Sequence, residues 1–229
     1  LGEALGTIHH VQRIEYQDIG DVFADVVRHM ETPVLRSAPA PMFILSGLAR
    51  SHGIKVVLTG EGADELFGGY DIFKEAKIRR FWARAPGSTM RPRILERLYP
   101  YLKNSPASGR AFTEEFFRTG IDQVESPYFA HLPRWTTTAR MFQFFSGDTR
   151  TALGNWDGLS TFGAVLPADI RRWLPLGRDQ YVEAHTLMSG YLLSSQGDRV
   201  AMANSVEGRV PFLDHRLIEF ANRLPPQLK

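Results

Sequence analysis

The stretch Val56–Tyr70, VVLTGEGADELFGGY, passes abruptly from an apolar run to glycines interleaved with carboxylates. Its three consecutive apolar residues, Val56–Leu58, predict a strand buried on both faces, as in a parallel sheet. Gly60 and Gly62 then allow a sharp turn and the close approach of a ligand to the backbone. Because ligands of open α/β sheets bind beyond the carboxyl ends of strands, we expect a ligand site at this turn.

The residues of the turn favour a phosphate-containing ligand. Bare backbone N–H groups at a strand-to-helix junction attract phosphate. Glu61, Asp64 and Glu65 would repel that phosphate unless a divalent cation lay between them, and Mg²⁺ is the usual bridge. A second interpretation stays open, in which these acids form the exposed first turn of a helix and are stabilised by its dipole. The pattern alone therefore predicts either a nucleotide–Mg²⁺ site or an acidic helix start.

Two segments resemble the signatures of one known family. Residues Thr59–Tyr70, TGEGADELFGGY, closely resemble the first signature of the synthetase domain of glutamine-hydrolysing asparagine synthetases, with Thr59 where that family usually has serine. Residues Gly197–His215, GDRVAMANSVEGRVPFLDH, resemble the second signature. The two matches occur in the family's order with similar-looking sequence between them, so the resemblance covers most of the chain.

The resemblance implies the fold class and the domain organisation. We expect an α/β fold, with a small parallel sheet of the adenine-nucleotide alpha hydrolase (PP-loop) type followed by a largely α-helical portion. Residues 1–229 would form one synthetase domain fragment, with an α/β nucleotide-binding part at 1–85 and a mainly helical part at 86–229. The sequence begins at Leu1 and lacks the family's Ser-Gly-Gly-x-Asp-Ser pyrophosphate loop. We therefore expect a piece of a longer protein that is incomplete at both ends and inactive alone.

The resemblance also implies the activity. The parent protein would be an ATP-dependent ligase that converts aspartate to asparagine through a β-aspartyl-adenylate, which ammonia from glutamine then attacks. ATP and Mg²⁺ are the implied cofactors, and an N-terminal glutaminase domain of the same polypeptide is the implied partner. We also expect a homodimer and a cytoplasmic location. Two alternatives stay open: a related amide or β-lactam-forming ligase with another carboxylate substrate, and a non-catalytic nucleotide-binding module.

The first signature carries the expected nucleotide and metal residues. By resemblance, Thr59, Gly60, Glu61 and Gly62 bind the nucleotide, with Thr59 and Gly60 contacting its adenylate portion through hydroxyl and backbone groups. Glu61 and Asp64 are the expected catalytic carboxylates beside the pyrophosphate. Of these two, Asp64 is expected to bind Mg²⁺ and Glu61 to orient the attacking groups.

Four further residues are expected to bind the substrate. Glu207 and Arg209 alternate in the second signature and would line the synthetase cleft, although the pattern fits an ordinary surface ion pair equally well. Arg199 is a helix arginine by pattern and a phosphate or substrate contact by resemblance. Arg36, in a proline-rich loop before a helix, is a candidate for binding the carboxylate of an amino acid.

Composition excludes several classes of function. With 43% hydrophobic and 23% charged residues in 229, the chain is an ordinary globular sequence. Its arginine groups at 79–80, 91–93 and 171–172 predict solvated helix faces rather than a nucleic-acid surface, since the net charge is only +2. No apolar stretch approaches the ~20 residues of a membrane helix. The absence of cysteine excludes disulfides, thiolate metal sites and the family's glutaminase nucleophile.

Local patterns predict the remaining elements. Apolar spacing and helix stop signals predict strands at 7–16 and 54–58 and helices at 18–30, 42–52, 72–84, 91–102, 111–119, 180–202 and 214–224. The polar, glycine-interrupted residues 146–163 predict a mobile loop. The order strand, helix, helix, strand at the start of the chain is typical of a parallel α/β sheet. No Walker loop, nucleophile elbow or zinc cluster is present in the sequence.

Overall fold

A computed structural model describes residues 2–34, 36–99 and 110–229, which form two compact units. Unit 1 consists of Leu1–Ala63 and Ala184–Phe220, and unit 2 consists of Asp64–Glu183 and Ala221–Lys229. Each unit thus combines two stretches of chain that are distant in sequence. The expected parts at 1–85 and 86–229 divide the chain by type of element instead, and that division stays a prediction.

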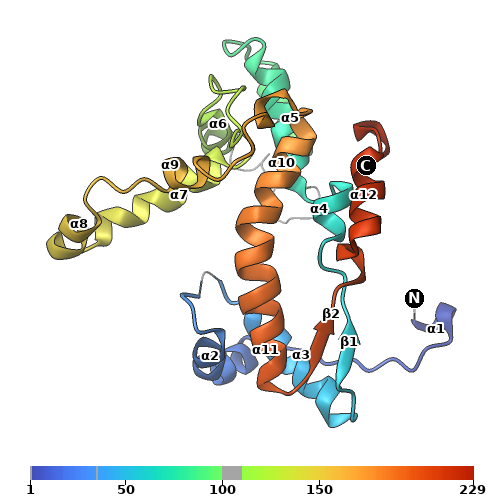
Figure 1. The fold of residues 1–229 in the computed structure, drawn as a ribbon. Helices are drawn as coiled ribbons and strands as arrows, with labels where there is room; N and C mark the ends of the chain where they lie inside the picture. Colours follow the sequence, from blue (N-terminus) through green and yellow to red (C-terminus); the bar gives the residue numbers. More distant parts are fainter. Residues whose placement is uncertain (1, 35, 100–109) are drawn as a thin grey trace. The chain divides into compact units, whose positions relative to one another are not determined.

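Unit 1 contains the sheet and the helices around it. Its elements are α1 (Gly2–Leu5), α2 (Tyr16–Met30), α3 (Pro39–Ser51), β1 (Val56–Leu58), η5 (Ala184–Arg199), α11 (Val200–Ala203), β2 (Glu207–Arg209), η6 (Pro211–Leu213) and the start of α12 (His215–Arg223). Strands β1 and β2 lie side by side and pair in parallel, with Val56 opposite Glu207 and Leu58 opposite Arg209 (Figure 1). The described part of the chain is therefore mostly helical, with a small two-stranded parallel sheet.

Two expectations about strands are wrong. Residues 7–15 form no strand, and Ile8 and Val11 are 88% and 76% exposed, because no neighbouring strand pairs with them. Strand β1 is not buried on both faces: Val56 is 40% and Leu58 is 74% exposed. A strand is buried on both faces only where further layers cover its sheet, and the described sheet has two strands.

The core of unit 1 lies where α2, α3 and η5 pack together. Its buried side chains are Val26, Met30, Ala40, Tyr191 and Val200. Helix α2 begins two residues before the predicted start, because Asp18 accepts a hydrogen bond from the Glu15 backbone N–H at 2.7 Å. This reciprocal cap fixes the first turn, and the apolar stripe of α2 then faces the core as its spacing predicts.

The long helix predicted at 180–202 is present as three segments. These are α10 (Pro175–Glu183) in unit 2 and then η5 and α11 in unit 1. Segment η5 has the wide i→i+5 turn of a π-helix, which is uncommon and often accompanies functional sites. At Gly197 a Cβ atom would lie 2.8 Å from the Leu192 carbonyl oxygen, so this turn leaves no room for a side chain there.

Unit 2 is helical among its described residues. Its elements are α4 (Ala63–Phe67, which begins at the last residue of the first stretch of unit 1), α5 (Asp71–Ala83), η1 (Arg91–Arg97), α6 (Arg110–Arg118), α7 (Leu132–Ala139), η3 (Arg140–Phe144), α8 (Gly147–Leu153), α9 (Gly158–Gly163), η4 (Ile170–Arg172), α10 and η7 (Pro226–Leu228). Trp82, Leu95 and Phe129 lie at the centre of its largest apolar cluster. The helix predicted at 91–102 is a shorter 3₁₀ segment, η1, and residues 100–102 lie outside the described ranges.

The expectation of a mobile loop at 146–163 is wrong, because helices α8 and α9 occupy most of these residues. Ser146 caps α8 by accepting a hydrogen bond from the Thr149 N–H at 3.2 Å. Asp157 caps α9 by accepting from Leu159 and Ser160. A serine or aspartate before a short helical run is a recognised N-cap signal, so these helices could have been predicted locally.

The arginines at 79–80 are not on a solvated helix face. Arg79 is 1% exposed and donates hydrogen bonds to the backbone carbonyls of Phe117, Thr119 and Phe129. Arg80 forms a two-bond ion pair with Asp179, at 2.7 and 2.8 Å. Both cations thus hold elements of unit 2 together. No helix in the described ranges is long and apolar enough to cross a bilayer.

Candidate functional site

The turn after β1 is joined to the second signature by backbone hydrogen bonds. The Thr59 N–H donates to the Arg209 carbonyl at 2.9 Å, which extends the parallel pairing one residue beyond β1. The Thr59 hydroxyl lies 3.4 Å from the same oxygen. The Ala63 N–H donates to the Gly60 carbonyl at 3.2 Å and closes the turn. The start of the first signature, Thr59–Ala63, and the second signature are far apart in sequence but are therefore joined in unit 1.

The two glycines of the turn differ in what surrounds them. Gly62 has φ +92°, and a Cβ there would lie 2.2 Å from Leu213 Cδ2, so the first signature packs directly on the second. Around Gly60 a Cβ would meet no atom within 4 Å. Only Gly62 is thus required by its surroundings in the chain, whereas Gly60 faces open space that a ligand could enter.

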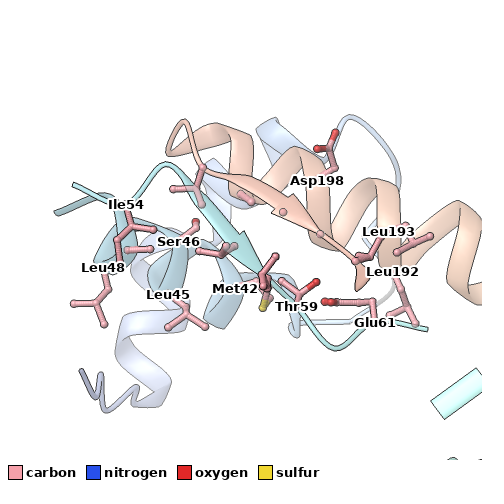
Figure 2. A pocket seen from close by; sticks show the side chains of 18 of the residues that line it. Met42, Leu45, Ser46, Leu48, Ile54, Thr59, Glu61, Leu192, Leu193 and Asp198 are labelled. Carbon is pink, nitrogen blue, oxygen red and sulfur yellow. The ribbon is translucent and has the colours of Figure 1, made fainter. Parts of the chain in front are cut away.

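A pocket of about 450 Å³ lies beside this turn, wholly within unit 1 (Figure 2). Its walls are largely apolar and come from α3, β1, β2 and η5, with Met42, Leu45 and Leu192 among them. Thr59 and Glu61 lie together at one end of it (Figure 2). An apolar cavity with a few polar groups at one end is the usual form of a small-molecule site.

Glu61 is the acidic residue of the first signature that lines this pocket. Its Oε2 atom is buried and has no hydrogen-bond partner among the described residues. A buried carboxylate oxygen without a partner is costly, and in native proteins such atoms commonly accept a hydrogen bond from a ligand or water. Glu61 is therefore suited to contact a bound molecule.

Asp64 is the first residue of unit 2 and is exposed. Its carboxylate makes no hydrogen bond or ion pair with a described residue, whereas its backbone carbonyl accepts from the Gly69 N–H at 3.0 Å. A Cβ at Gly69 would lie 2.0 Å from Asp64 Oδ1, so the carboxylate lies directly against the bare glycine backbone. The Asp64 carboxylate is thus exposed, and its oxygens are available.

These oxygens fit a magnesium ion that is shared with a phosphate. Mg²⁺ is commonly held by one or two carboxylates together with substrate phosphates and water, rather than by a cage of protein ligands. In the described ranges no three acidic or histidine side chains converge to form such a cage. Asp64 carries an exposed carboxylate that could be one ligand of such a shared ion.

Glu65 and Tyr70, which belong to the same signature, face the interior of unit 2. Glu65 is 3% exposed, and the Tyr70 hydroxyl donates to its Oε1 at 3.2 Å. Burial raises the pKa of Glu65, and the charge of Glu183 adds to this shift. Burial likewise raises the pKa of Tyr70. Of the three acids in the turn, Glu65 is thus turned away from solvent and is not placed to face a phosphate.

The candidate arginines outside the first signature already have contacts within unit 1. Arg199 donates to the Met30 carbonyl at 2.7 Å and lies 3.8 Å from Glu31, so it completes the carboxyl end of α2. The Arg36 guanidinium is stacked 5.3 Å from the ring centre of Tyr191. Neither residue lines the 450 Å³ pocket. Their role in substrate binding stays a prediction.

Glu207 and Arg209 form an exposed ion pair on β2. Arg209 Nε lies 2.8 Å from Glu207 Oε1, and both side chains are more than half exposed. The hydrogen bond to Glu207 raises the pKa of Arg209. This contact is the one that the alternating pattern predicts, and it leaves the proposed substrate role of both residues untested.

Sequence reasoning missed two polar residues of the second signature. Asp198 lines the pocket. Asn204 donates its amide N–H groups to the Phe43 carbonyl at 3.0 Å and to the Ser46 hydroxyl at 2.9 Å, which ties the end of α11 to α3. Their place inside the Gly197–His215 match was the available signal, but no local pattern distinguishes them from surface polar residues.

Comparisons with known proteins identify a family for this chain. The family model described as asparagine synthase matches residues 1–229. No solved structure matches the chain.

Curated relatives of two kinds cover nearly the whole chain. An amidase of Penicillium rubens, chyE, is 30% identical over 239 residues, which cover 98% of this chain and 34% of that protein. A putative glutamine-hydrolysing asparagine synthetase of Mycobacterium tuberculosis is 30% identical over 227 residues, covering 99% and 32%. Asparagine synthetase (glutamine-hydrolysing) 1 of Bacillus subtilis is 28% identical over 229 residues, covering 99% and 33%. The chain therefore spans about a third of the length of these relatives.

Proposed function

The chain belongs to the asparagine synthase family, and from this membership we propose that it is part of an ATP-dependent ligase that forms an amide through an acyl-adenylate. The observation that carries the proposal is the pocket at the carboxyl end of β1, with Thr59 and Glu61 at one end and a partnerless buried oxygen on Glu61. A PP-loop type sheet is part of the same proposal, and the parallel pairing of β1 with β2 supports it.

The nucleotide binds with its base in the apolar part of the pocket. The side chains of Met42, Leu45 and Leu192 provide the flat apolar contact that a purine ring needs. Thr59 and Gly60 contact the adenylate, because Thr59 carries a hydroxyl at the end of the pocket and Gly60 has open space on its Cα. Gly62 contributes by allowing the tight turn that brings these groups together.

Charge is the physical obstacle in this reaction. A carboxylate has to approach a triphosphate, and negative charge accumulates on the pyrophosphate that leaves. Asp64, whose carboxylate has no partner among the described residues, would hold the Mg²⁺ that cancels part of this charge when it is bound. Backbone N–H groups of the turn that are not already bonded within the chain would add fixed dipoles toward the phosphates.

The proposed reaction has two steps. A side-chain carboxylate oxygen of aspartate attacks the α-phosphorus of ATP and the bond to the bridging oxygen breaks, which releases pyrophosphate and leaves the β-aspartyl-adenylate. Ammonia from glutamine then attacks the acyl carbon, and AMP leaves with the electron pair of the acyl–oxygen bond. The amine loses a proton to give asparagine. Glu61, at the end of the pocket, orients these attacking groups.

Substrate recognition and partners complete the proposal. Arg36, Arg199, Glu207 and Arg209 are proposed to contact the amino-acid substrate. Each would have to keep or exchange the contact that it now makes within unit 1. The parent protein would include an N-terminal glutaminase domain as the source of ammonia, form a homodimer and act in the cytoplasm.

A second candidate differs in the carboxylate that is activated. The relative named as an amidase, chyE, is as similar to this chain, at 30%, as the putative asparagine synthetase of Mycobacterium tuberculosis. This equal similarity favours keeping open an amide-forming ligase with another carboxylate substrate. The ATP chemistry at Thr59, Glu61 and Asp64 would be the same.

The test is exchange of labelled pyrophosphate into ATP by the full-length protein. Adenylation is reversible before ammonia arrives, so we expect label in ATP only when the correct carboxylate is present. Aspartate should support exchange, whereas glutamate and succinate serve as controls. Exchange with another carboxylate but not with aspartate would select the second candidate. Absence of exchange with every carboxylate tested, in a folded protein, would contradict the ligase proposal.

A further inference from the structure

The short helix α4 carries the proposed metal residue and cannot satisfy its own carboxyl end. It spans five residues, Ala63–Phe67, and Asp64 lies in its first turn. The last carbonyls of any α-helix lack partners within the helix. The Gly69 N–H donates a hydrogen bond to the Asp64 carbonyl. The carbonyls of Glu65 and Leu66 therefore need hydrogen-bond donors from elsewhere in unit 2.

Gln180, on α10, supplies both partners. Its Nε2 donates to the Glu65 carbonyl at 2.6 Å and to the Leu66 carbonyl at 2.8 Å. Its Oε1 accepts from Lys229 Nζ at 3.3 Å. This arrangement fixes the orientation of the amide, since only the NH₂ group can face two carbonyls and only the oxygen can face an ammonium group. The residue as a whole is 9% exposed, so water does not readily replace its amide group.

We propose that Gln180 is a positioning residue for the Asp64 carboxylate: it caps α4 so that this carboxylate is held ready for a metal–phosphate group. The inference rests on the proposed function. The capping bonds do not touch Asp64, but they fix the helix on which it lies. A helix this short has almost no stability of its own, so its position depends on contacts such as these.

The contact of the Asp64 carboxylate with Gly69 depends on the position of α4. Asp64 Oδ1 lies 2.0 Å from the place of a Cβ at Gly69, which means that the carboxylate fits closely against that backbone. If α4 frays at Glu65 and Leu66, the Asp64 carboxylate loses its contact with the Gly69 backbone. Polar groups that hydrogen-bond a metal ligand directly commonly change metal affinity by roughly 10- to 100-fold when they are removed. Gln180 acts through the backbone of α4, so we expect an effect of roughly 10-fold, at the lower end of that range.

The test uses Gln180→Met in the full-length protein. Methionine keeps the length and most of the volume of glutamine but has no N–H donor, so the fold should survive while the two carbonyls lose their partner. Gln196→Met is the matched control, because Gln196 is a glutamine of η5 in unit 1 and has no hydrogen bond to α4. Gln180→Glu is the second variant, in which an acceptor replaces the donor.

Two measurements are made on each variant. Hydrogen exchange of the ligand-free protein reports whether residues 63–70 open more often, independently of any activity. The Mg²⁺ concentration for half-maximal pyrophosphate exchange reports whether the metal is held more weakly. We expect Gln180→Met and Gln180→Glu to increase exchange in 63–70 and to raise the half-saturating Mg²⁺ concentration by roughly 10-fold, with the rate at saturating Mg²⁺ retained. Gln196→Met should change neither quantity.

Two results would overturn the inference. Unchanged hydrogen exchange in residues 63–70 would show that Gln180 does not hold α4. Increased exchange with an unchanged Mg²⁺ requirement would show that Gln180 stabilises the helix but does not position Asp64. Failure of the proposed function itself would be seen elsewhere, as absence of pyrophosphate exchange in the unaltered protein.

Discussion

Replacing Gly62 by alanine tests whether the two signature segments depend on direct contact in unit 1. Gly62 has φ +92°, a backbone conformation that residues with a Cβ rarely adopt. The added methyl would also lie 2.2 Å from Leu213 Cδ2 and 2.8 Å from Leu213 Cγ. Two separate penalties therefore act on the same variant.

The size of the effect follows from these two penalties. Holding a residue with a side chain in a sparsely populated backbone region costs about 1–3 kcal/mol. Forcing an extra methyl group into a filled contact costs about 1–3 kcal/mol. Together they predict a loss of about 2–6 kcal/mol. Gly60→Ala is the matched control, since a Cβ there meets nothing within 4 Å and no positive φ constrains it.

Native-state hydrogen exchange of the full-length protein measures this loss locally. The Thr59 N–H donates to the Arg209 carbonyl and the Glu207 N–H donates to the Lys55 carbonyl, so both amides report on the β1–β2 pairing. A loss of 2 kcal/mol or more corresponds to at least a roughly 25-fold lower protection factor, since each 1.4 kcal/mol is tenfold. Gly60→Ala should leave both amides protected.

A double variant separates the two penalties. Leu213→Ala removes the atoms that the new methyl would strike, so it should recover the packing part of the loss in Gly62→Ala and leave the backbone part. Equal losses in Gly60→Ala and Gly62→Ala would refute the reasoning. So would additive effects of Gly62→Ala and Leu213→Ala, because additivity would mean that the two residues do not interact.

Further variants test other parts of the structure. Asp64→Asn should abolish pyrophosphate exchange by the full-length protein while its far-ultraviolet circular dichroism is unchanged, since it removes the carboxylate that is proposed to hold Mg²⁺; normal exchange in this variant would remove Asp64 from the metal site. Arg79→Met leaves three backbone carbonyls without their donor and should cost about 3 kcal/mol or more, seen as a lower thermal unfolding midpoint; an unchanged midpoint would contradict this role. Burial raises the pKa of Glu65 above its ordinary value of 4.5, so its contribution to stability is complete below that pH and is lost as the pH rises through the folded-state pKa. Glu65→Gln should therefore remove the loss of stability that occurs as the pH rises. At pH 7 the variant should unfold at a higher temperature than the unaltered protein. If the thermal unfolding midpoints of the two proteins change with pH in parallel, this role of Glu65 is contradicted.

Local sequence patterns predicted several elements well. The helices expected at 72–84 and 111–119 are α5 (Asp71–Ala83) and α6 (Arg110–Arg118), and the last helix is α12 (His215–Arg223). These helices have apolar residues at helical spacing and begin or end near recognisable boundary residues, which are properties of neighbouring residues only. The short strand β1 and the turn after it were predicted for the same reason.

The errors have a different origin. The expected strand at 7–16 contains suitable residues, but a strand exists only when another strand pairs with it, and that depends on distant parts of the chain. The arginines at 79–80 look like a charged helix surface, yet one binds three carbonyls and the other pairs with Asp179, which is 99 residues away. Partners at such separations leave no mark on local periodicity.

The sequence by itself determined the kind of chemistry at the turn, because it fixes which residues carry carboxylates, which lack a Cβ, and which family signature they match. Only the tertiary structure decided what each acid does: Glu61 lines a pocket, Asp64 lies exposed against Gly69, and Glu65 is buried. Gln180, 115 residues from Glu65, holds the helix that carries two of these acids. The physical reason is that burial and hydrogen-bond partners are set by packing between elements that are far apart in the chain, whereas residue identity is not.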